Sequence, residues 1–308
     1  MANFNIRHDC LLFSAPAFYR QTDWYRAMGW CAHSGSILLT GDFNGDGRAD
    51  MMCHDSKGNK WVALANSAGQ FTTTTWHNKG APWCGHKGAQ LHLGDFNGDG
   101  RTDMLCHDLA GNKWVALARP DGSFKGTSWQ KNLKWCYHKG SRLMIGDFNG
   151  DGRADMFCYD NKNKWISFAQ PGGSFLGTSW HMANGWCSHG GSSIFIADFN
   201  GDLRDDLLCH DSLGRNWVML AGPGGKLSGR SDWHSSQRWC SRAELHLGYL
   251  NADKRADMLC HRPSDGYKWV STAQANSKSR SNAELVKPPH PSRLYRLQLN
   301  DYARYVPR

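Results

Sequence analysis

The sequence lacks the features that mark several classes of protein. Its longest candidate apolar run, 10–18, is far shorter than the roughly 18 residues of a membrane-spanning helix, so we expect no membrane insertion. A secretion signal begins with a basic segment followed by an apolar one, and the first ten residues do not show this pattern. No stretch carries helical periodicity over about eleven residues or more. The net charge of +9 comes without a dense Lys/Arg run or a nucleic-acid-binding motif, so we expect no nucleic-acid partner.

Catalytic motifs are missing as well. The sequence contains no G-x-S-x-G, no H-E-x-x-H and no phosphate-binding loop. We therefore predict that the chain is not an enzyme and has no catalytic residues.

Cysteine, in contrast, is frequent and regularly placed. Ten of the eleven cysteines alternate between a Trp-Cys and a Cys-His-Asp-like context, 22 residues apart in four pairs and 20 in the fifth. One pair per repeat predicts one disulfide per repeat and an oxidising, extracellular compartment for a secreted mature chain. The predicted pairs are Cys31–Cys53, Cys84–Cys106, Cys136–Cys158, Cys187–Cys209 and Cys240–Cys260. Ten reduced, buried cysteines are the alternative, and Cys10 is left over as a free or intermolecular thiol.

A ten-residue acidic segment, here termed the acidic loop, recurs at 41–50, 94–103, 146–155, 197–206 and 248–257. All fifteen tryptophans keep step with it, in three classes of five. In the second repeat, Gly/Asn/Asp turns bound four short apolar segments, which predict strands at 90–95, 102–108, 113–119 and 122–129. Four antiparallel strands repeated about every 50 residues are typical of propeller blades. The sequence therefore predicts an all-β propeller with four-stranded antiparallel blades.

The number of blades follows from the ends of the chain. We predict a single domain, 1–308, with repeats at about 36–88, 89–140, 141–191, 192–242 and 243–290. Residues 9–24 match the last two strands of a blade, and 292–306 resemble the start of one. Residues 1–30 and 291–308 are therefore predicted to combine into a sixth, closing blade, which removes the free edge of the ring. Five or seven blades are the alternatives.

The acidic loop has the chemistry of a calcium site. Numbered from its first Asp, it offers side-chain oxygens at positions 1, 3, 5 and 9 and a backbone carbonyl at position 7, much like the first half of an EF-hand loop. Four copies predict about four Ca²⁺ sites, with these ligands: Asp42, Asn44, Asp46, Arg48 and Asp50; Asp95, Asn97, Asp99, Arg101 and Asp103; Asp147, Asn149, Asp151, Arg153 and Asp155; Asp198, Asn200, Asp202, Arg204 and Asp206. The fifth copy has Tyr249 at position 1 and Lys254 at position 6, so we expect no Ca²⁺ there. Ordinary Asp/Asn/Gly turns are the alternative, but they leave the Asp at position 9 unexplained.

"DFNGDGRADM" followed by "WVALA" and a Gly/Phe stretch resembles the FG-GAP/VCBS repeats of a β-propeller family that includes the integrin α-subunit head and the Psathyrella velutina lectin. The resemblance covers about 30–275. It implies structural Ca²⁺ in the acidic loops and sugars of the N-acetylglucosamine type bound between neighbouring blades. The Trp-Cys and Cys-His-Asp elements depart from the family pattern.

The Trp-Cys-x-His segments upstream of four acidic loops are the candidate ligand sites. An indole ring can stack on a sugar, and an imidazole can hydrogen-bond to hydroxyl groups, which is the usual make-up of a binding pocket. The candidates are Trp30, His33, Trp83, His86, Trp135, His138, Trp186 and His189. Buried packing of these indoles and turn-capping by these histidines is the alternative. For the tryptophans of the "WVALA" class (Trp61, Trp114, Trp165, Trp217 and Trp269) we expect a place in the core.

Together these patterns predict a calcium-stabilised extracellular lectin with several equivalent sites between blades, whose partners are glycans or glycoproteins. The alternative is an adhesion, matrix or protein-interaction propeller without sugar binding. Its partner would be an acidic polysaccharide or another extracellular protein.

Overall fold

The short apolar segments of each repeat form one antiparallel sheet, or blade, in the computed structural model, which describes residues 29–275. Blade 1 consists of β1 (Ser36–Gly41), β2 (Asp50–Asp55), β3 (Lys60–Ala63) and β4 (Trp76–His77). Blade 2 consists of β5 (Gln90–Gly94), β6 (Asp103–His107), β7 (Asn112–Ala116) and β8 (Trp129–Asn132). Blade 3 consists of β9 (Arg142–Gly146), β10 (Asp155–Tyr159), β11 (Asn163–Ser167) and β12 (Trp180–Ala183). Blade 4 consists of β13 (Ser192–Ala197), β14 (Asp206–Asp211), β15 (Asn216–Met219) and β16 (Trp233–Ser235), and blade 5 of β17 (Glu244–Gly248), β18 (Asp257–His261) and β19 (Lys268–Ser271).

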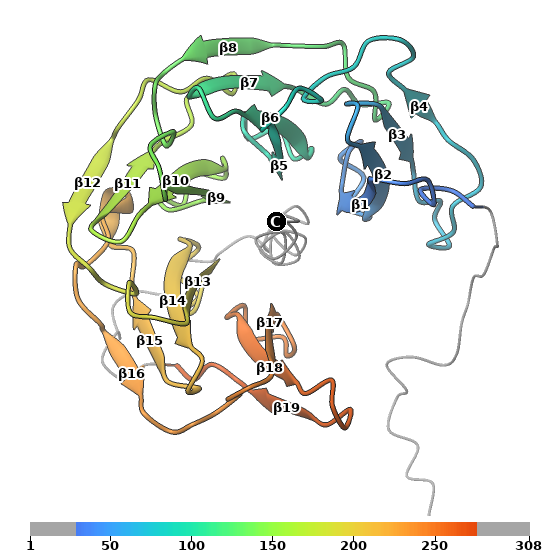
Figure 1. The fold of residues 1–308 in the computed structure, drawn as a ribbon. Coiled ribbons are helices and arrows are strands. Elements are labelled where there is room, and N and C mark those ends of the chain that lie inside the picture. The colour runs from blue at the N-terminus through green and yellow to red at the C-terminus, as the bar shows by residue number, and fades with distance from the viewer. Residues whose placement is uncertain (1–28, 276–308) are drawn as a thin grey trace, which may run out of the picture.

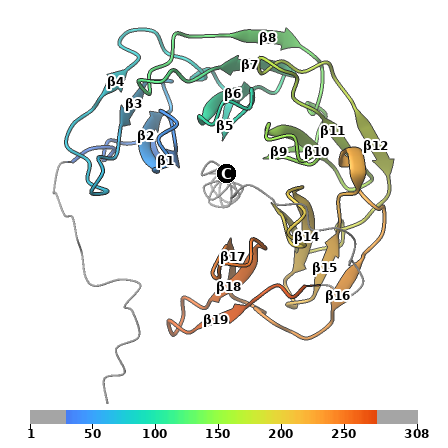
Figure 2. The same ribbon diagram turned by 180° about the vertical axis from the view of Figure 1, so that it is seen from behind.

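The blades stand around a central axis, with the first strand of each nearest the centre (Figures 1 and 2). Every sheet keeps chain order, so each strand pairs with the one that follows it. One turn of 3₁₀-helix, η1 (Pro223–Gly225), lies in the connection between β15 and β16. No helix within 29–275 has the length and apolar character that crossing a membrane requires. The predicted propeller of four-stranded antiparallel blades is confirmed. The described residues make five blades, and the proposed closing blade lies outside them except for residues 29 and 30.

The predicted range of the fourth strand is wrong. Residues 122–129 do not form a strand; only an isolated bridge joins Ala118 to Phe124, and β8 begins at Trp129. Gly126 has a φ of +95°, which breaks the extended conformation between the bridge and the strand. Phe124 is nevertheless buried, because the bridge turns its ring into the core between blades 1 and 2. The apolar character of 122–129 therefore reflects packing rather than strand pairing.

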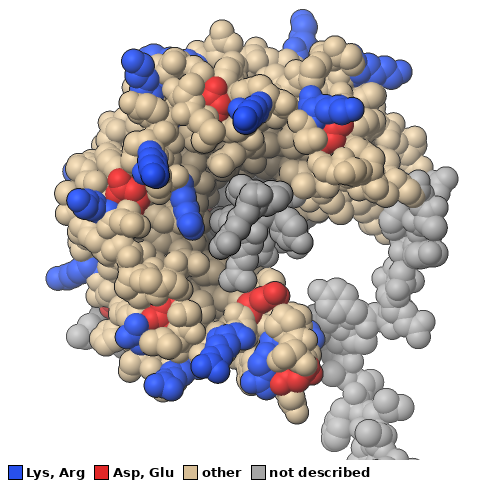
Figure 3. Space-filling model, in the orientation of Figure 1, with Lys and Arg blue, Asp and Glu red and all other residues tan. Residues whose placement is uncertain are grey.

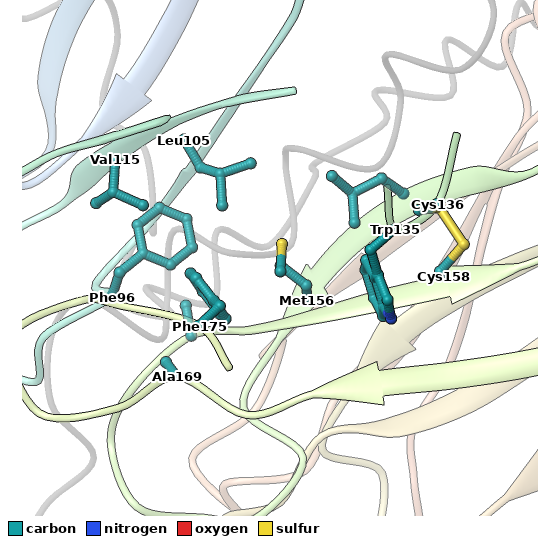
Figure 4. Packing of buried hydrophobic residues seen from close by; sticks show 11 residues of the cluster. Phe96, Leu105, Val115, Trp135, Cys136, Met156, Cys158, Ala169 and Phe175 are labelled. Atoms are coloured by element: carbon teal, nitrogen blue, oxygen red, sulfur yellow. A yellow bond between two sulfur atoms is a disulfide. The ribbon is translucent and has the colours of Figure 1, made fainter. Parts of the chain in front are cut away.

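The hydrophobic cores lie between adjacent blades, as Figure 4 shows for blades 2 and 3. Since side chains alternate between the two faces of a strand, each row of paired residues faces one neighbouring blade. Leu105 and Val115 are partners on adjacent strands of blade 2 and face blade 3. Met156 and Cys158 of blade 3 pack against them. Blades 2, 3 and 4 thus each bury one face on the blade before and the other on the blade after.

The acidic loops are hydrogen-bonded to one another from blade to blade. The backbone carbonyl at position 1 of a loop accepts a bond from the backbone N–H at position 8 of the next loop. The four bonds are Thr102 N to Asp42 O (2.6 Å), Ala154 N to Asp95 O (2.6 Å), Asp205 N to Asp147 O (2.7 Å) and Ala256 N to Asp198 O (2.8 Å). The glycine at position 4 lies against the Arg side chain of the next loop, as Gly98 does against Arg153. The loops therefore form a continuous line of contacts through blades 1 to 5.

A lysine without exposed surface marks each interface after blades 1, 2 and 3. The ammonium of Lys113 donates to Trp135 O at 2.6 Å and to Gly111 O at 3.3 Å, so it joins blade 2 to the chain that enters blade 3. Burial lowers the pKa of Lys113 to about 8. Lys60 and Lys164 occupy the same place in blades 1 and 3. The equivalent Lys268 of blade 5 is exposed, because no described blade follows it.

Two sheet faces are open at the ends of this series. Val270 of blade 5 is 55% exposed, whereas its equivalents Val62, Val115 and Ile166 are 0% exposed. On the opposite side of the opening, Leu38 of blade 1 is 52% exposed, whereas its blade 5 equivalent Leu245 is 4% exposed. Side chains that are buried in the cores between other blades are thus exposed on one face of blade 1 and on one face of blade 5. We propose that the predicted closing blade, from 1–30 and 291–308, covers both faces.

The closing blade can be tested at Val270. We expect Val270→Ala to lower the free energy of unfolding by about 2 kcal/mol, because full burial of a valine contributes roughly 1.5–3 kcal/mol. Val115→Ala, at the matched position of blade 2, should cost about the same in chemical denaturation of the full chain. A cost below about 0.5 kcal/mol for Val270→Ala, as at an ordinary surface position, would show that this face stays open.

Candidate functional site

The acidic loop connects the first and second strands of each blade, and in blades 1 to 4 its first carboxylate holds it in shape. In blade 2 the Asp95 carboxylate accepts bonds from the backbone N–H groups of Gly98 (2.7 Å), Asp99 (3.2 Å) and Gly100 (2.8 Å). The Asp99 carboxylate accepts from the Asn97 amide (2.7 Å) and pairs with the guanidinium of Arg101. The side-chain oxygens at positions 1, 3 and 5 are therefore fixed within one tight turn.

The Asp at position 9 has a structural task that the sequence analysis missed. Asp103 is fully buried, and its two oxygens accept bonds from Phe96 N (3.0 Å) and Ala118 N (2.8 Å). It thereby joins the acidic loop to the chain that follows β7. Burial raises the pKa of Asp103 well above its ordinary value, and repulsion from the Asp95 and Asp99 carboxylates acts in the same direction. The same two backbone bonds recur at Asp50, Asp155, Asp206 and Asp257.

The fifth acidic loop keeps the backbone bonds of the position 9 carboxylate but lacks one of the proposed metal ligands. Asp257 keeps both backbone bonds, although position 1 is Tyr249 and lacks a carboxylate. Lys254 at position 6 has a φ of +65°, and Leu203 in the fourth loop has a φ of +70°. Both adopt the conformation that glycine has in the first three loops. The loop shape and the position 9 bonds thus survive without the full set of oxygen ligands.

The oxygen donors of the first four loops fit a hard cation in their chemistry. Carboxylate, amide and carbonyl oxygens are the ligands that Ca²⁺ takes. Repulsion from Asp95 and Asp99 adds to burial in raising the pKa of Asp103, and a bound cation would relieve that repulsion. Within 29–275, however, only Glu244, His246 and His261 bring three ligand atoms of Asp, Glu, His or Cys within 4.8 Å of one another. Calcium binding by the acidic loops therefore stays a prediction.

The five predicted disulfides are confirmed. Each joins the linker, meaning the chain between one blade's last strand and the next blade's first strand, to the second strand of the following blade. The linker cysteines have φ values of +53° to +61°, an uncommon conformation outside glycine. The tryptophan before each of four of these cysteines donates its indole N–H to a hydroxyl in that blade: Trp30 to Thr74, Trp83 to Thr127, Trp135 to Thr178 and Trp186 to Ser231. These four indoles, proposed as ligand contacts, therefore take part in fixing the linker on its blade.

Each of the four linker histidines lies against a tryptophan of the third strand. The ring centroids are 5.1 Å apart for His33 and Trp61, 5.3 Å for His86 and Trp114, 5.2 Å for His138 and Trp165, and 5.0 Å for His189 and Trp217, all edge to face. The tryptophan pairs across the strands with the disulfide cysteine, as Trp114 does with Cys106, so the disulfide brings the linker to the ring. These tryptophans, expected in the core, are half-buried instead.

A carboxylate from the end of the second strand completes each group. The His Nε2 to Asp Oδ2 distances are 3.9 Å for His33–Asp55, 3.5 Å for His86–Asp108, 2.9 Å for His138–Asp160 and 3.4 Å for His189–Asp211. Asp108 also accepts bonds from Ala110 N and from Asn112. Although burial acts to raise the pKa of Asp108, the bonds from Asn112 hold it below its ordinary value. We call each set of three residues a Trp–His–Asp cluster.

The clusters of the later blades differ in detail. In blade 4, Arg215 pairs with Asp211 and lies over the Trp217 ring at 5.4 Å. Blade 5 has Arg242 and Arg262 in the places of the histidine and the aspartate, and the Arg262 guanidinium lies 4.9 Å from the centre of the Trp269 ring. Blade 5 therefore has no Trp–His–Asp cluster. The sequence pattern identifies the histidines but not their partners, since the Asp lies 22 residues and the Trp 27 or 28 residues further along the chain.

Comparison with known proteins bears on the family and the fold. The model of the FG-GAP-like repeat matches residues 42–106, 95–158 and 147–209, which together make up more than half of the chain. None of the curated proteins matches by sequence. The structure is similar to that of an Agrocybe aegerita lectin described as recognising non-reducing terminal N-acetylglucosamine, with a TM-score of 0.59 and 18% identity, over 79% of this chain and 67% of that one. A Lactobacillus plantarum protein matches with a TM-score of 0.42 and 12% identity, over 73% of this chain and 69% of that one.

The task of the position 9 carboxylate can be tested at Asp103. We expect Asp103→Asn to lower the free energy of unfolding by about 1–3 kcal/mol in chelator as well as in Ca²⁺, because an amide nitrogen cannot accept one of the two buried backbone bonds. Denaturation of this variant should be compared with that of Asp121→Asn, which changes an exposed carboxylate in the same blade. A loss of stability confined to calcium-containing buffer would assign Asp103 to metal binding alone.

Proposed function

The chain belongs to the FG-GAP-like repeat family, and on that basis we propose that it is an extracellular, calcium-stabilised lectin that binds glycans at its Trp–His–Asp clusters. The observation that carries the proposal is the fourfold recurrence of the cluster at the seam between a blade and the linker that enters it. Recurrence suits a multivalent binder, in which weak equivalent sites combine into high avidity. It does not suit a single active site, and we accordingly propose binding rather than catalysis.

The cluster has the parts that sugar recognition uses. The half-buried indole stacks on His77 in blade 1 and on His181 in blade 3, and the rest of its apolar surface can meet the C–H groups of a pyranose ring. The imidazole and the carboxylate offer a donor and acceptors for the hydroxyl groups of the sugar. In blade 2 the Asp108 carboxylate is fixed by the turn that follows β6 and lies 3.5 Å from the Nε2 of His86. This arrangement orients the imidazole before a ligand arrives, which lowers the entropic cost of binding.

The proposed sugar class is that of N-acetylated sugars. It draws on the fold shared with the Agrocybe aegerita lectin, which is described as recognising terminal N-acetylglucosamine. The proposed compartment draws on the five disulfides, since such bonds persist in oxidising surroundings.

In the proposed calcium sites, positions 1, 3, 5 and 9 of the first four acidic loops supply side-chain oxygens, and the arginine at position 7 supplies its backbone carbonyl. Bound Ca²⁺ would neutralise the carboxylates that crowd each loop. The chain's own part is to hold the position 1 carboxylate by three backbone N–H groups, as Asp95 is held in blade 2.

A cationic surface favours a second candidate, an adhesion or matrix module for acidic polysaccharides. The net charge is +9, and on the face shown in Figure 3 lysine and arginine side chains outnumber acidic ones. These basic side chains lie dispersed around the ring rather than in one patch. Dispersed charge favours weak, salt-sensitive attraction over a defined site, so we rank this candidate second.

The lectin proposal predicts binding of N-acetylglucosamine to the calcium-loaded chain. Combined substitution of His33, His86, His138 and His189 by alanine should weaken binding at least about tenfold, which corresponds to ~1.4 kcal/mol per site. Titration calorimetry and a glycan array provide the measurements, and Lys131→Ala, an exposed change on β8, is the matched control.

A folded, calcium-loaded wild type that binds no array glycan would exclude the lectin. Retention on sulfated polysaccharide that is lost with added salt, without binding to neutral sugars, would favour the matrix module instead.

Calcium removal gives a separate prediction. Chelation should lower the melting temperature of the wild type, because a ligand at a hundred times its Kd stabilises the folded state by about 2.7 kcal/mol per site. Asp99→Asn in the second loop should reduce this difference in melting temperature. Asp253→Asn, the matched change in the fifth loop, should leave it unchanged. Identical melting in calcium and in chelator would contradict calcium binding by the loops.

A further inference from the structure

Blade 5 carries three potential metal ligands on the face that points away from blade 4. His261 of β18 is the direct cross-strand partner of Glu244 on β17. His246 is two residues beyond Glu244 on the same strand, so all three side chains project from one face. Leu245, between them in sequence, points the other way into the core with blade 4. The face with the ligands is the one next to the opening beside blade 1 (Figure 1).

We propose that Glu244, His246 and His261 form a binding site for a divalent transition metal of the zinc class. Their ligand atoms lie within 4.8 Å of one another. Glu244 Oε2 is 3.7 Å from His246 Nε2 and 3.5 Å from His261 Nδ1. Metal bonds of about 2.0–2.1 Å in a tetrahedron place neighbouring ligand atoms ~3.3 Å apart, so small side-chain rotations complete the geometry.

The donor set distinguishes this site from the acidic loops. Two imidazole nitrogens and one carboxylate oxygen suit Zn²⁺, whereas Ca²⁺ takes oxygen ligands. Three protein ligands leave one tetrahedral position for water or for an anionic group of a partner. All three side chains are partly exposed among the described residues, and they lie on the same sheet face as Val270, which the proposed closing blade would cover.

The other blades provide an internal comparison. At the positions of Glu244, His246 and His261, blade 2 has Gln90, His92 and His107. Blade 2 thus keeps the histidine pair but has a neutral amide in place of the carboxylate, and blade 3 covers this face. The equivalent three positions of blade 1 are Ile37, Leu39 and His54. Among these three blades, only blade 5 carries the complete donor set.

Two cations of the described residues, Lys268 and Arg262, lie close to the site and pair with other groups. Lys268, the partner of His261 on β19, donates its ammonium to Gly266 O at 3.0 Å. Arg262 pairs with Asp265 and lies over the rings of Tyr267 and Trp269. Both cations therefore pair with groups of the turn between β18 and β19, and not with the three proposed ligands.

The test is a titration of the full chain with Co²⁺ in excess Ca²⁺, followed by displacement with Zn²⁺. We expect one Co²⁺ equivalent with the intense visible absorption of a tetrahedral site, and loss of that absorption when Zn²⁺ is added. Glu244→Gln, which recreates the blade 2 donor set, should weaken Zn²⁺ binding by at least about 10- to 100-fold, the range seen even for residues that only support a ligand. Lys268→Gln, on the same face, should leave the affinity equal or higher.

Equal zinc affinity of the wild type and Glu244→Gln would overturn the proposal and place the ion elsewhere on the chain. Absorption typical of octahedral Co²⁺ in the wild type would also overturn it. Circular dichroism and N-acetylglucosamine titration of Glu244→Gln should match the wild type, because the site lies apart from the Trp–His–Asp clusters. The metal site and the lectin proposal can therefore fail independently.

Discussion

The hydrogen bond between successive acidic loops is the constraint on which the rest of the structure depends. The position 1 carbonyl of each loop meets the position 8 N–H of the next, so every loop must present both groups at the same height and angle. The shape of the loop follows from this requirement. Its first carboxylate closes the turn, its last carboxylate ties the turn to the outer part of the blade, and its position 4 glycine makes room for the arginine of the following loop. Repetition of the sequence is therefore a condition for stacking the blades in register.

Once the loops fix the inner edge, the outer parts of the blades meet face to face. This contact explains why a lysine can be buried at three of the interfaces. The Lys113 ammonium finds the carbonyl groups of Gly111 and Trp135 only because the linker into blade 3 passes over it. The pKa of Lys113 is lowered because burial disfavours its charged form. The linker is in turn held by its disulfide and by the Trp135 indole bond to Thr178. The Trp–His–Asp cluster forms where this linker meets the third strand, so the candidate site is a consequence of how blades are joined.

Much of this could be predicted from the sequence because it is local and periodic. The approximate strand positions and the disulfide pairs follow from spacing alone. The disulfide pairs are confirmed, and so are the strands, except that β7 ends at Ala116 and the fourth strand begins only at Trp129. The environment of a side chain is harder to predict from the sequence, since it depends on which face of a strand meets which neighbouring blade. The sequence predicts Trp114 in the core, yet its ring lies against His86 and is half-buried. For Asp103 the sequence predicts only a metal-ligand role, because its backbone partners, Phe96 and Ala118, lie on two different connections.

The fifth repeat shows which parts of the pattern the fold itself requires. It keeps the loop-to-loop bond to blade 4, the disulfide between the linker and β18, and the position 9 carboxylate that ties the acidic loop to the chain after β19. It has lost the position 1 carboxylate and the histidine and aspartate of the cluster, none of which takes part in the bond to blade 4. The loop-to-loop bond, the position 9 carboxylate and the disulfide, which all five repeats share, are therefore parts of the fold itself. The position 1 carboxylate and the histidine and aspartate of the cluster, which only the first four repeats share, belong to the proposed sites. The Glu244, His246 and His261 set lies in the repeat that lacks them.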